Sequence, residues 1–257
     1  MIAGLDMWQY TSVEPFLIKD ERLQKRLGVK ELRWPPDFRD RQSDIVNYNL
    51  KIPAVRFPRW HYCPFCGTMQ KVGYFTKQPT CDAYQWPHGR KCNPNARYRH
   101  KLIPERFVVV CPDGHIDDFP IAEWVHFDSE HKYHPETCRI RRSTGGTSAA
   151  LTGVRYECSC GASKTMASAL RPGALKRIGY TCKASKPWLG MEEDSEHPCT
   201  CETEKIKVLQ RGASNVWFGD TRSSIYIPTD DETASRRIVG IVNEYIDSVR
   251  NSRLNGE

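Results

Sequence analysis

Cysteine constrains the fold of this chain more than any other residue type. The sequence has 11 cysteines among 257 residues, and several of them stand two or three positions apart. Its first six residues lack the basic segment, apolar core and cleavage site of a secretory signal. Thiols stay reduced in the cytoplasm, so a dense set of spaced cysteines indicates metal ligation rather than disulfides. The sequence therefore predicts a cytoplasmic protein whose loops are held together by structural zinc, Zn(2+).

Length and charge exclude some classes of protein and leave others open. A chain of 257 residues can bury roughly 70–75% of its unfolded surface, which supports a hydrophobic core. No segment approaches the ~18 consecutive apolar residues of a membrane span, so we expect no membrane association. Lysine and arginine total 38 against 31 aspartate and glutamate residues, a net charge of +7. This mild basic excess permits nucleic-acid binding, but ordinary soluble proteins carry it equally often.

The hydrophobic pattern predicts short elements in the first 228 residues. Helices are expected at 14–28 and 163–170. Apolar or alternating side chains predict strands at 107–111, 153–158 and 205–209. We therefore expect an irregular α+β fold in which short strands and loops are stapled by structural zinc sites.

The last helix has the clearest pattern. Residues 229–232 have the sequence Thr-Asp-Asp-Glu, which is a capping box, and apolar residues follow at helical spacing. Those apolar residues are Ile238, Val242, Tyr245, Ile246 and Val249. The predicted organisation is a helical and extended segment at 1–56, a zinc-stapled region at 57–228 and a C-terminal helix at 229–257.

The first cysteine set has the strongest metal signal. Its C-x2-C pair is followed by a glycine, the pattern of a zinc knuckle, and two further cysteines complete a tetrahedral set. The members are Cys63, Cys66, Cys81 and Cys92. Four thiolates leave no open position on the metal, so the site is predicted to be structural. His88 is an alternative ligand to Cys81 or Cys92.

Two further sets have weaker patterns. The second begins with a C-x-C pair, and its predicted members are Cys158, Cys160, Cys182 and Cys199, with Cys201 as an alternative to Cys199. The third combines two cysteines with two histidines, and its predicted members are Cys111, His115, His126 and Cys138. Small buried cysteines and hydrogen-bonded histidines are the ordinary alternative for both sets.

Catalytic motifs are few. The sequence has no phosphate-binding G-x4-G-K-[ST] loop, no H-E-x-x-H and no G-x-S-x-G. One acidic group could hold Mg²⁺ in a nuclease-like site, because hard cations prefer carboxylates. That group consists of Asp113, His115, Asp117 and Asp118. Aspartates at such positions also serve as turn and capping residues.

A basic stretch follows the first cysteine set. Its cationic members are Arg90, Lys91, Arg97, Arg99, Lys101 and Arg106. Basic side chains beside a zinc loop suit contacts to the phosphate backbone of DNA. A solvated or partner-facing surface is the alternative.

Several longer motifs occur in order along the chain. Residues 57–60 (Phe-Pro-Arg-Trp) precede the first cysteine pair, and residues 106–120 include the segment Cys-Pro-Asp-Gly-His-Ile-Asp-Asp. Others lie at 124–126, 143–146, 160–163, 187–190 and 209–216. Together these motifs resemble the DrmB family of the DISARM bacterial anti-phage system.

The resemblance implies function as well as family. It implies a subunit without a catalytic role of its own, which joins a DrmA-like superfamily-2 helicase in a hetero-complex that acts on DNA. Members of the family are typically longer and carry a further zinc-binding region, so the chain is expected to correspond to their front part. Ile121 departs from the pattern, since the resemblance leads us to expect an aromatic residue after the Asp-Asp-Phe-Pro segment.

Three hypotheses follow. The first is a zinc-stabilised, non-enzymatic subunit that helps bind DNA, and the second is a metal-dependent nuclease that uses the acidic group. The third is a zinc module that binds only proteins. Closed thiolate sites favour the first, whereas an open, carboxylate-rich site favours the second.

Overall fold

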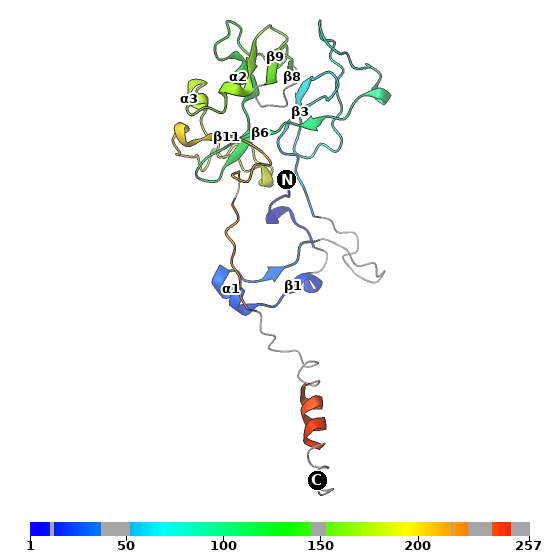
Figure 1. Ribbon diagram of the computed structural model, residues 1–257, viewed down its shortest axis with the longest axis vertical. Helices are drawn as coiled ribbons and strands as arrows, with labels where there is room; N and C mark the ends of the chain where they lie inside the picture. The colour runs from blue at the N-terminus through cyan, green and yellow to red at the C-terminus, as the bar shows by residue number, and fades with distance from the viewer. Residues whose placement is uncertain (11–12, 37–51, 145–152, 217, 226–237, 248–257) are drawn as a thin grey trace. The chain divides into compact units, whose positions relative to one another are not determined.

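The chain folds into two compact units. The computed structural model describes residues 1–10, 13–36, 52–144, 153–216, 218–225 and 238–247 (Figure 1). The larger unit comprises residues 1–13 and 35–219, and the smaller unit comprises residues 14–34 and 220–257. Within the described ranges, no helix has the length and apolar character needed to cross a membrane.

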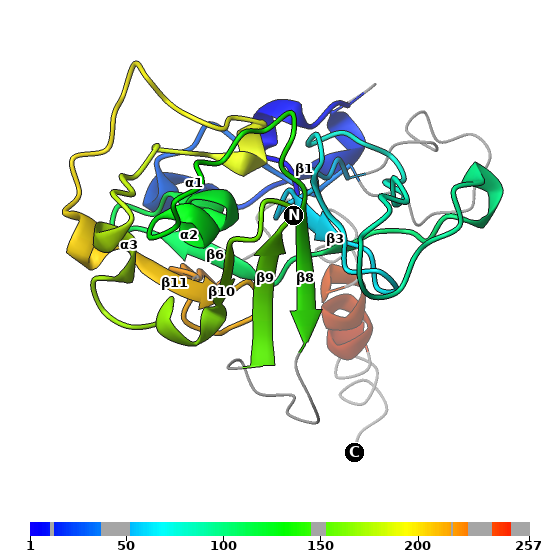
Figure 2. The same ribbon diagram turned by 90° about the horizontal axis from the view of Figure 1, so that it is seen from above.

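Among its described residues, the larger unit has three antiparallel sheets of three short strands each. In the first, the spatial order is β4 (Met69–Lys71), β3 (Trp60–Tyr62) and β5 (Ile103–Pro104). In the second, it is β11 (Lys207–Gln210), β6 (Phe107–Val110) and β7 (Ile116–Asp118). In the third, it is β10 (Ser163–Thr165), β9 (Val154–Cys158) and β8 (Ile140–Thr144), which lie side by side in Figure 2.

The helices of the larger unit are short. The α-helices are α2 (Ile121–His126) and α3 (Ala174–Arg177). The 3-10 helices among the described residues are η1 (Leu5–Met7), η3 (Ala96–Tyr98), η5 (Met166–Ser168), η6 (Pro187–Leu189) and η7 (Thr203–Lys205). The mixture of short strands and short helices confirms the predicted irregular α+β fold.

The smaller unit contains the second half of the helix predicted at 14–28, whereas residues 14–18 form a 3-10 turn and a short strand that pairs with residues 32–33. Its elements are η2 (Glu14–Phe16), β1 (Leu17–Ile18), α1 (Glu21–Leu27) and β2 (Leu32–Arg33). Asp20 caps α1 by accepting a hydrogen bond from the amide of Leu23 at 2.8 Å. Gly28 ends the helix in the left-handed region at φ 66°, which glycine adopts without steric cost.

The C-terminal helix is also confirmed, over residues 238–247. Its apolar side chains Ile238, Val242, Tyr245 and Ile246 are exposed. The capping box at 229–232 and Val249 lie outside the described residues.

Strand pairing overturns one expected helix. Residues 163–165 form β10, whose Ser163 and Thr165 pair with Glu157 and Arg155 of β9. Only a single 3-10 turn, η5, follows. The chain reverses at Gly161, where φ is 97°, so the segment returns along β9 as a hairpin before a helix can begin.

The described part of the larger unit has three buried cores, and the two that contain cysteines are a main core and a small core. The main core gathers large side chains from α2, β6 and β9, among them Trp124, Tyr156 and Phe107 with at most 1% of their surface exposed. The small core packs beside β3 and β4 and consists of Cys63, Cys66, Val72, Cys81, Ala83, Cys92 and Leu102. Four of these seven residues are cysteines, so the small core has few aliphatic side chains.

A buried ion pair joins the first and third sheets. Arg142 of β8 places its Nε 3.2 Å from Oε2 of Glu105, and both side chains are almost fully buried. The Arg142 guanidinium also lies over the ring of Tyr62, 4.6 Å from its centre. Charges buried to this extent require each other, because either one alone would be desolvated without a partner.

Candidate metal centres and basic surface

Centre 1 is the group formed by Cys63, Cys66, Cys81 and Cys92. All four are buried, and their Sγ atoms all lie within 4.8 Å of one another. The separations are 3.5 Å between Cys63 and Cys92 and 3.6 Å between Cys66 and Cys81. The structure thus brings together the four residues of the first predicted set. His88 is exposed and belongs to no group of candidate ligands among the described residues.

The knuckle of centre 1 is a tight turn between β3 and β4. The Cys63 amide donates to the Thr68 carbonyl at 2.9 Å, and the Gly67 amide donates to the Cys63 carbonyl at 2.9 Å. Gly67 has φ 78°, and a Cβ there would lie 2.2 Å from the Arg142 carbonyl oxygen. The Arg142 amide donates to the Gly67 carbonyl at 2.8 Å, so the turn is fixed against β8. Only glycine satisfies this conformation and this approach.

The thiols of centre 1 do not all ionise readily. A hydrogen bond from Cys81, helped by one from Thr68, lowers the pKa of Cys66 to about 4. Burial, followed by the neighbouring thiols of Cys63 and Cys66, raises the pKa of Cys92 to about 12. Four thiolates packed this closely repel one another, so a cation between them is required before all four lose their protons.

Centre 2 is the group formed by His126, Cys138, Cys158 and Cys160, with ligand atoms again within 4.8 Å. His126 ends α2, and its Nδ1 lies 2.7 Å from the Ala122 carbonyl. That carbonyl can only accept, so Nδ1 carries the proton and donates it. The lone pair therefore stands on Nε2, which lies 3.4 Å from Sγ of Cys160. Metal-binding histidines are usually oriented in this way, by a hydrogen bond from the ring nitrogen that does not bind the metal.

Centre 3 is the group formed by Cys111, Cys182, Cys199 and Cys201. Cys111 is buried and the other three are partly exposed. Burial raises the pKa of Cys201 to about 12. Two more candidate ligands adjoin centre 3. Nδ1 of His115 lies 3.3 Å from Sγ of Cys111, and Asp113 accepts a hydrogen bond from Sγ of Cys199 at 3.2 Å.

The second and third predicted sets are regrouped in the structure. Cys158 and Cys160 join residues of the third set in centre 2, whereas Cys182 and Cys199 join Cys111 in centre 3. Strand pairing is the reason in both cases. Ile140 pairs with Cys158, which brings Cys138 to the end of β9. Val110 pairs with Lys207, which brings the 199–201 loop to the end of β6.

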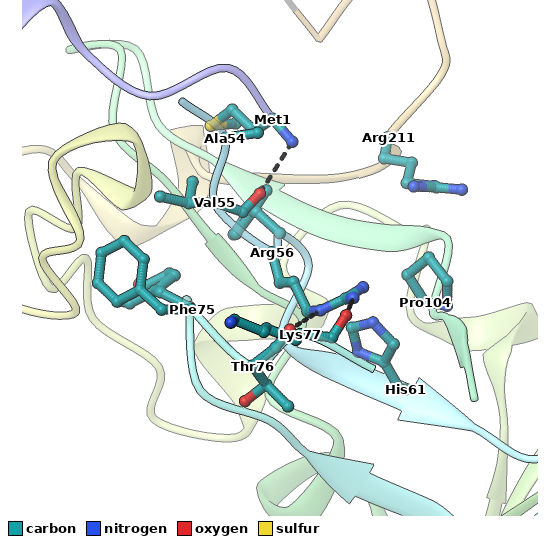
Figure 3. Close-up of a pocket in the computed structure, with 12 residues that line it drawn as sticks. Met1, Ala54, Val55, Arg56, His61, Phe75, Thr76, Lys77, Pro104 and Arg211 are labelled. Carbon is teal, nitrogen blue, oxygen red and sulfur yellow. Dashed lines mark hydrogen bonds between the residues drawn. The ribbon is translucent and has the colours of Figure 1, made fainter. Parts of the chain in front are cut away.

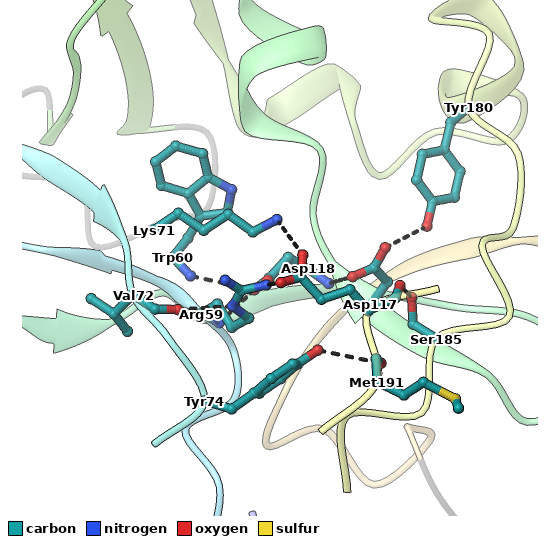
Figure 4. A network of polar contacts seen from close by, with 11 residues as sticks. Arg59, Trp60, Lys71, Val72, Tyr74, Asp117, Asp118, Tyr180, Ser185 and Met191 are labelled. Carbon is teal, nitrogen blue, oxygen red and sulfur yellow. Dashed lines mark hydrogen bonds and ion pairs between the residues drawn. The ribbon is translucent and has the colours of Figure 1, made fainter. Parts of the chain in front are cut away.

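The four residues of the nuclease hypothesis separate into two places. Asp113 and His115 adjoin centre 3, whereas Asp117 and Asp118 belong to a polar network between β7 and β3 (Figure 4). Asp118 accepts from the amides of Arg59 at 2.7 Å and Trp60 at 3.4 Å.

Hydrogen bonding explains the role of both network aspartates. Tyr180 donates to Asp117 at 3.4 Å, so each carboxylate is used within the fold. Burial, followed by repulsion from Asp117, raises the pKa of Asp118 to about 6. Within the part of the chain that the structure describes, neither aspartate belongs to a group of candidate metal ligands.

The basic stretch lies largely on the surface around centre 1. Arg99 is half-buried, and the other five cationic residues of the stretch are exposed. Arg90 lies over Phe65 of the knuckle, 5.5 Å from its ring centre, and Phe65 stacks on His100 at 5.0 Å. None of the six basic side chains forms an ion pair with another described residue. Their charge is therefore available to a partner.

Comparison with known proteins places the chain in a family. A family model described as a domain of unknown function, DUF8724, matches residues 1–218. The chain is also 29% identical over 228 residues to the DISARM protein DrmB of Bacillus paralicheniformis, a match that covers 88% of this chain and 36% of that protein. The chain thus spans about a third of the length of this relative. On this evidence the chain belongs to the DUF8724 family and is a homologue of DrmB.

Proposed function

We propose that this chain is a zinc-stabilised, non-enzymatic subunit of a DISARM-type anti-phage defence complex in the bacterial cytoplasm. In this complex it joins a DrmA-like superfamily-2 helicase and helps to bind DNA. The observation that carries the proposal is the similarity to the DISARM protein DrmB over 88% of the chain. The match covers only 36% of that relative, so we assign to these residues one part of the function of the longer protein.

The three centres support structural zinc. Four ligands at Zn–S bonds of about 2.3 Å in a tetrahedron place sulfurs about 3.8 Å apart. The Sγ separations of 3.5, 3.6 and 3.9 Å in centres 1 and 3 agree with this value. Thiolate and imidazole ligands select zinc over magnesium or calcium. A metal held by four protein ligands has no open position for substrate, which supports a role without catalysis.

The basic stretch supports contact with the DNA backbone. Arg97 is exposed and Arg99 half-buried, and neither makes an ion pair within the described residues. The guanidinium of Arg99 donates to the Pro94 carbonyl at 3.0 Å, which holds it beside η3. Cations without the spaced polar side chains of a recognition helix neutralise phosphates and do not select bases.

Salt dependence of DNA affinity tests this role. Each phosphate contact to duplex DNA contributes about 0.9 to the logarithmic salt slope, so replacing Arg97 and Arg99 by alanine should lower the slope by about 2. Binding should weaken alike for unrelated sequences. Replacing the exposed Arg171 and Lys132 is the matched control and should leave the slope unchanged.

The measurement is made on the chain alone and in complex with the helicase partner. An unchanged slope in both states, together with weaker subunit association, would reassign the basic stretch from DNA to the partner protein. Zinc content is measured in every variant, because loss of centre 1 would alter this surface indirectly.

A further inference from the structure

A cleft of about 490 Å³ opens beside β3 in the larger unit (Figure 3). Three cationic side chains line it, those of Arg56, Lys77 and Arg211. The described residues that line it include no aspartate and no glutamate. A concave surface that carries positive charge alone concentrates anions.

The positive charge of the cleft is not neutralised within the fold. Arg56 donates from Nε to the Thr76 carbonyl and from Nη2 to the Lys77 carbonyl, so its guanidinium is held in place by neutral groups. The side chains of Lys77 and Arg211 make no hydrogen bond or ion pair with the rest of the described chain, and both are exposed. An anion that enters the cleft would relieve the repulsion among these three cations.

Apolar side chains also line the cleft. They include Val55, Phe75 and Pro104, and Phe75 is 63% exposed. An exposed aromatic ring beside cationic side chains suits the stacking of a nucleobase. A second cleft of about 1240 Å³ shares Phe57 and Arg211 with the first, which leaves room for a longer ligand.

We propose that the cleft at Arg56, Lys77 and Arg211 binds a nucleotide, with the phosphate on the three cations and the base against Phe75. The nucleotide is either free or the phosphorylated end of a DNA strand. Its three cationic residues are not among the six of the basic stretch. Variants of Lys77 and Arg211 therefore test this site separately from the DNA contact proposed at Arg97 and Arg99.

Calorimetric titration of the zinc-loaded full chain tests the site. Adenosine monophosphate should bind. Adenosine, which lacks the phosphate, should bind at least about tenfold more weakly. The double variant K77A/R211A should weaken binding of the monophosphate by about tenfold or more. Arg56 is left in place because it also holds the backbone at residues 76–77.

The control variant R171A/K132A removes two exposed charges elsewhere and should bind the monophosphate as the wild type does. A short oligothymidylate with a 5′-phosphate, compared with its 5′-hydroxyl form, shows whether the bound phosphate belongs to a strand end or to a free nucleotide. Tighter binding of the phosphorylated strand than of the monophosphate assigns the site to a strand end, and the reverse assigns it to a free nucleotide. Equal affinity for adenosine and its monophosphate, or unaltered binding by K77A/R211A, would overturn the proposal.

Discussion

The small core and the main core consist of different kinds of side chain. The small core has four cysteines and three aliphatic residues, whereas the main core has aromatic side chains such as Trp124 and Tyr156. Burying large apolar side chains supplies folding free energy directly. Thiols supply little until a metal joins them. Centre 1 therefore stands where the small core lacks large apolar side chains, whereas centres 2 and 3 adjoin the well-packed main core.

Disrupting centre 1 should cause the largest loss of folding stability, and it is the most direct test of the difference between the two cores. Replacing Cys66 by serine should remove one zinc and unfold the segment 63–102, because structural zinc contributes about 10 kcal/mol or more to folding. Elemental analysis gives the zinc content, and hydrogen exchange reports the amides of β3 and β4. The amides of α2 in the main core should stay protected.

The matched variant is Cys160→Ser in centre 2. It should also lose one zinc, but protection of β9 should fall only locally, since Tyr156 and Trp124 keep the surrounding core packed. Full zinc content in Cys66→Ser, or equal loss of protection across both cores, would show that the two regions do not differ as proposed.

Breaking the buried ion pair should have the next largest effect and test how the sheets of the two regions are coupled. Glu105→Ala leaves Arg142 buried without its partner, which should lower the free energy of unfolding by about 3–5 kcal/mol. Denaturant unfolding measures the loss. Glu202→Ala, which removes an exposed partner of Lys205, is the control and should cost less than about 1 kcal/mol. Equal costs for both would mean that Glu105 and Arg142 do not join the sheets.

Asp118→Asn should cause the smallest change in the free energy of unfolding, and the size of this change should depend on pH. The pKa of Asp118 is about 6 in the folded chain, above its ordinary value of 3.8, so the folded state binds this proton more tightly than the unfolded state. Stability from this group is therefore present below about pH 4 and lost as the pH rises through 6. Asparagine is never charged, so relative to the wild type the variant should gain up to about 3 kcal/mol between pH 4 and 6.

The quantity measured is the difference in unfolding free energy between Asp118→Asn and the wild type at each pH. Both proteins have the same candidate metal ligands, so the difference removes the pH dependence of any metal binding. A difference that is flat from pH 4 to 7 would contradict a buried, partly protonated Asp118.

Local patterns in the sequence predicted local structure well. The helix stop at Gly28, the strands β6 and β9 and the C-terminal helix all depend on residues close together in the chain. The four cysteines of centre 1 lie within one short segment, and their grouping was predictable for the same reason.

Centres 2 and 3 were not predictable as groups, because each joins segments that only strand pairing brings together. The C-x-C spacing says nothing about which distant loop adjoins β9, and the pairing of β8 with β9 decides it. The sequence pattern offers Cys201 only as an alternative to Cys199, yet both belong to centre 3. The cationic cleft was missed entirely, since its residues lie at 56, 77 and 211 without any motif.

The turn at Gly67 has a consequence for how this family can evolve. Any side chain there meets both an unfavourable φ of 78° and the Arg142 carbonyl. Pro64 and Phe65 in the same turn face no such double restriction, and both are exposed. Mutational drift should therefore vary the two residues between the cysteines more than the glycine that follows them. Among homologues, loss of this glycine should coincide with loss of the whole cysteine set.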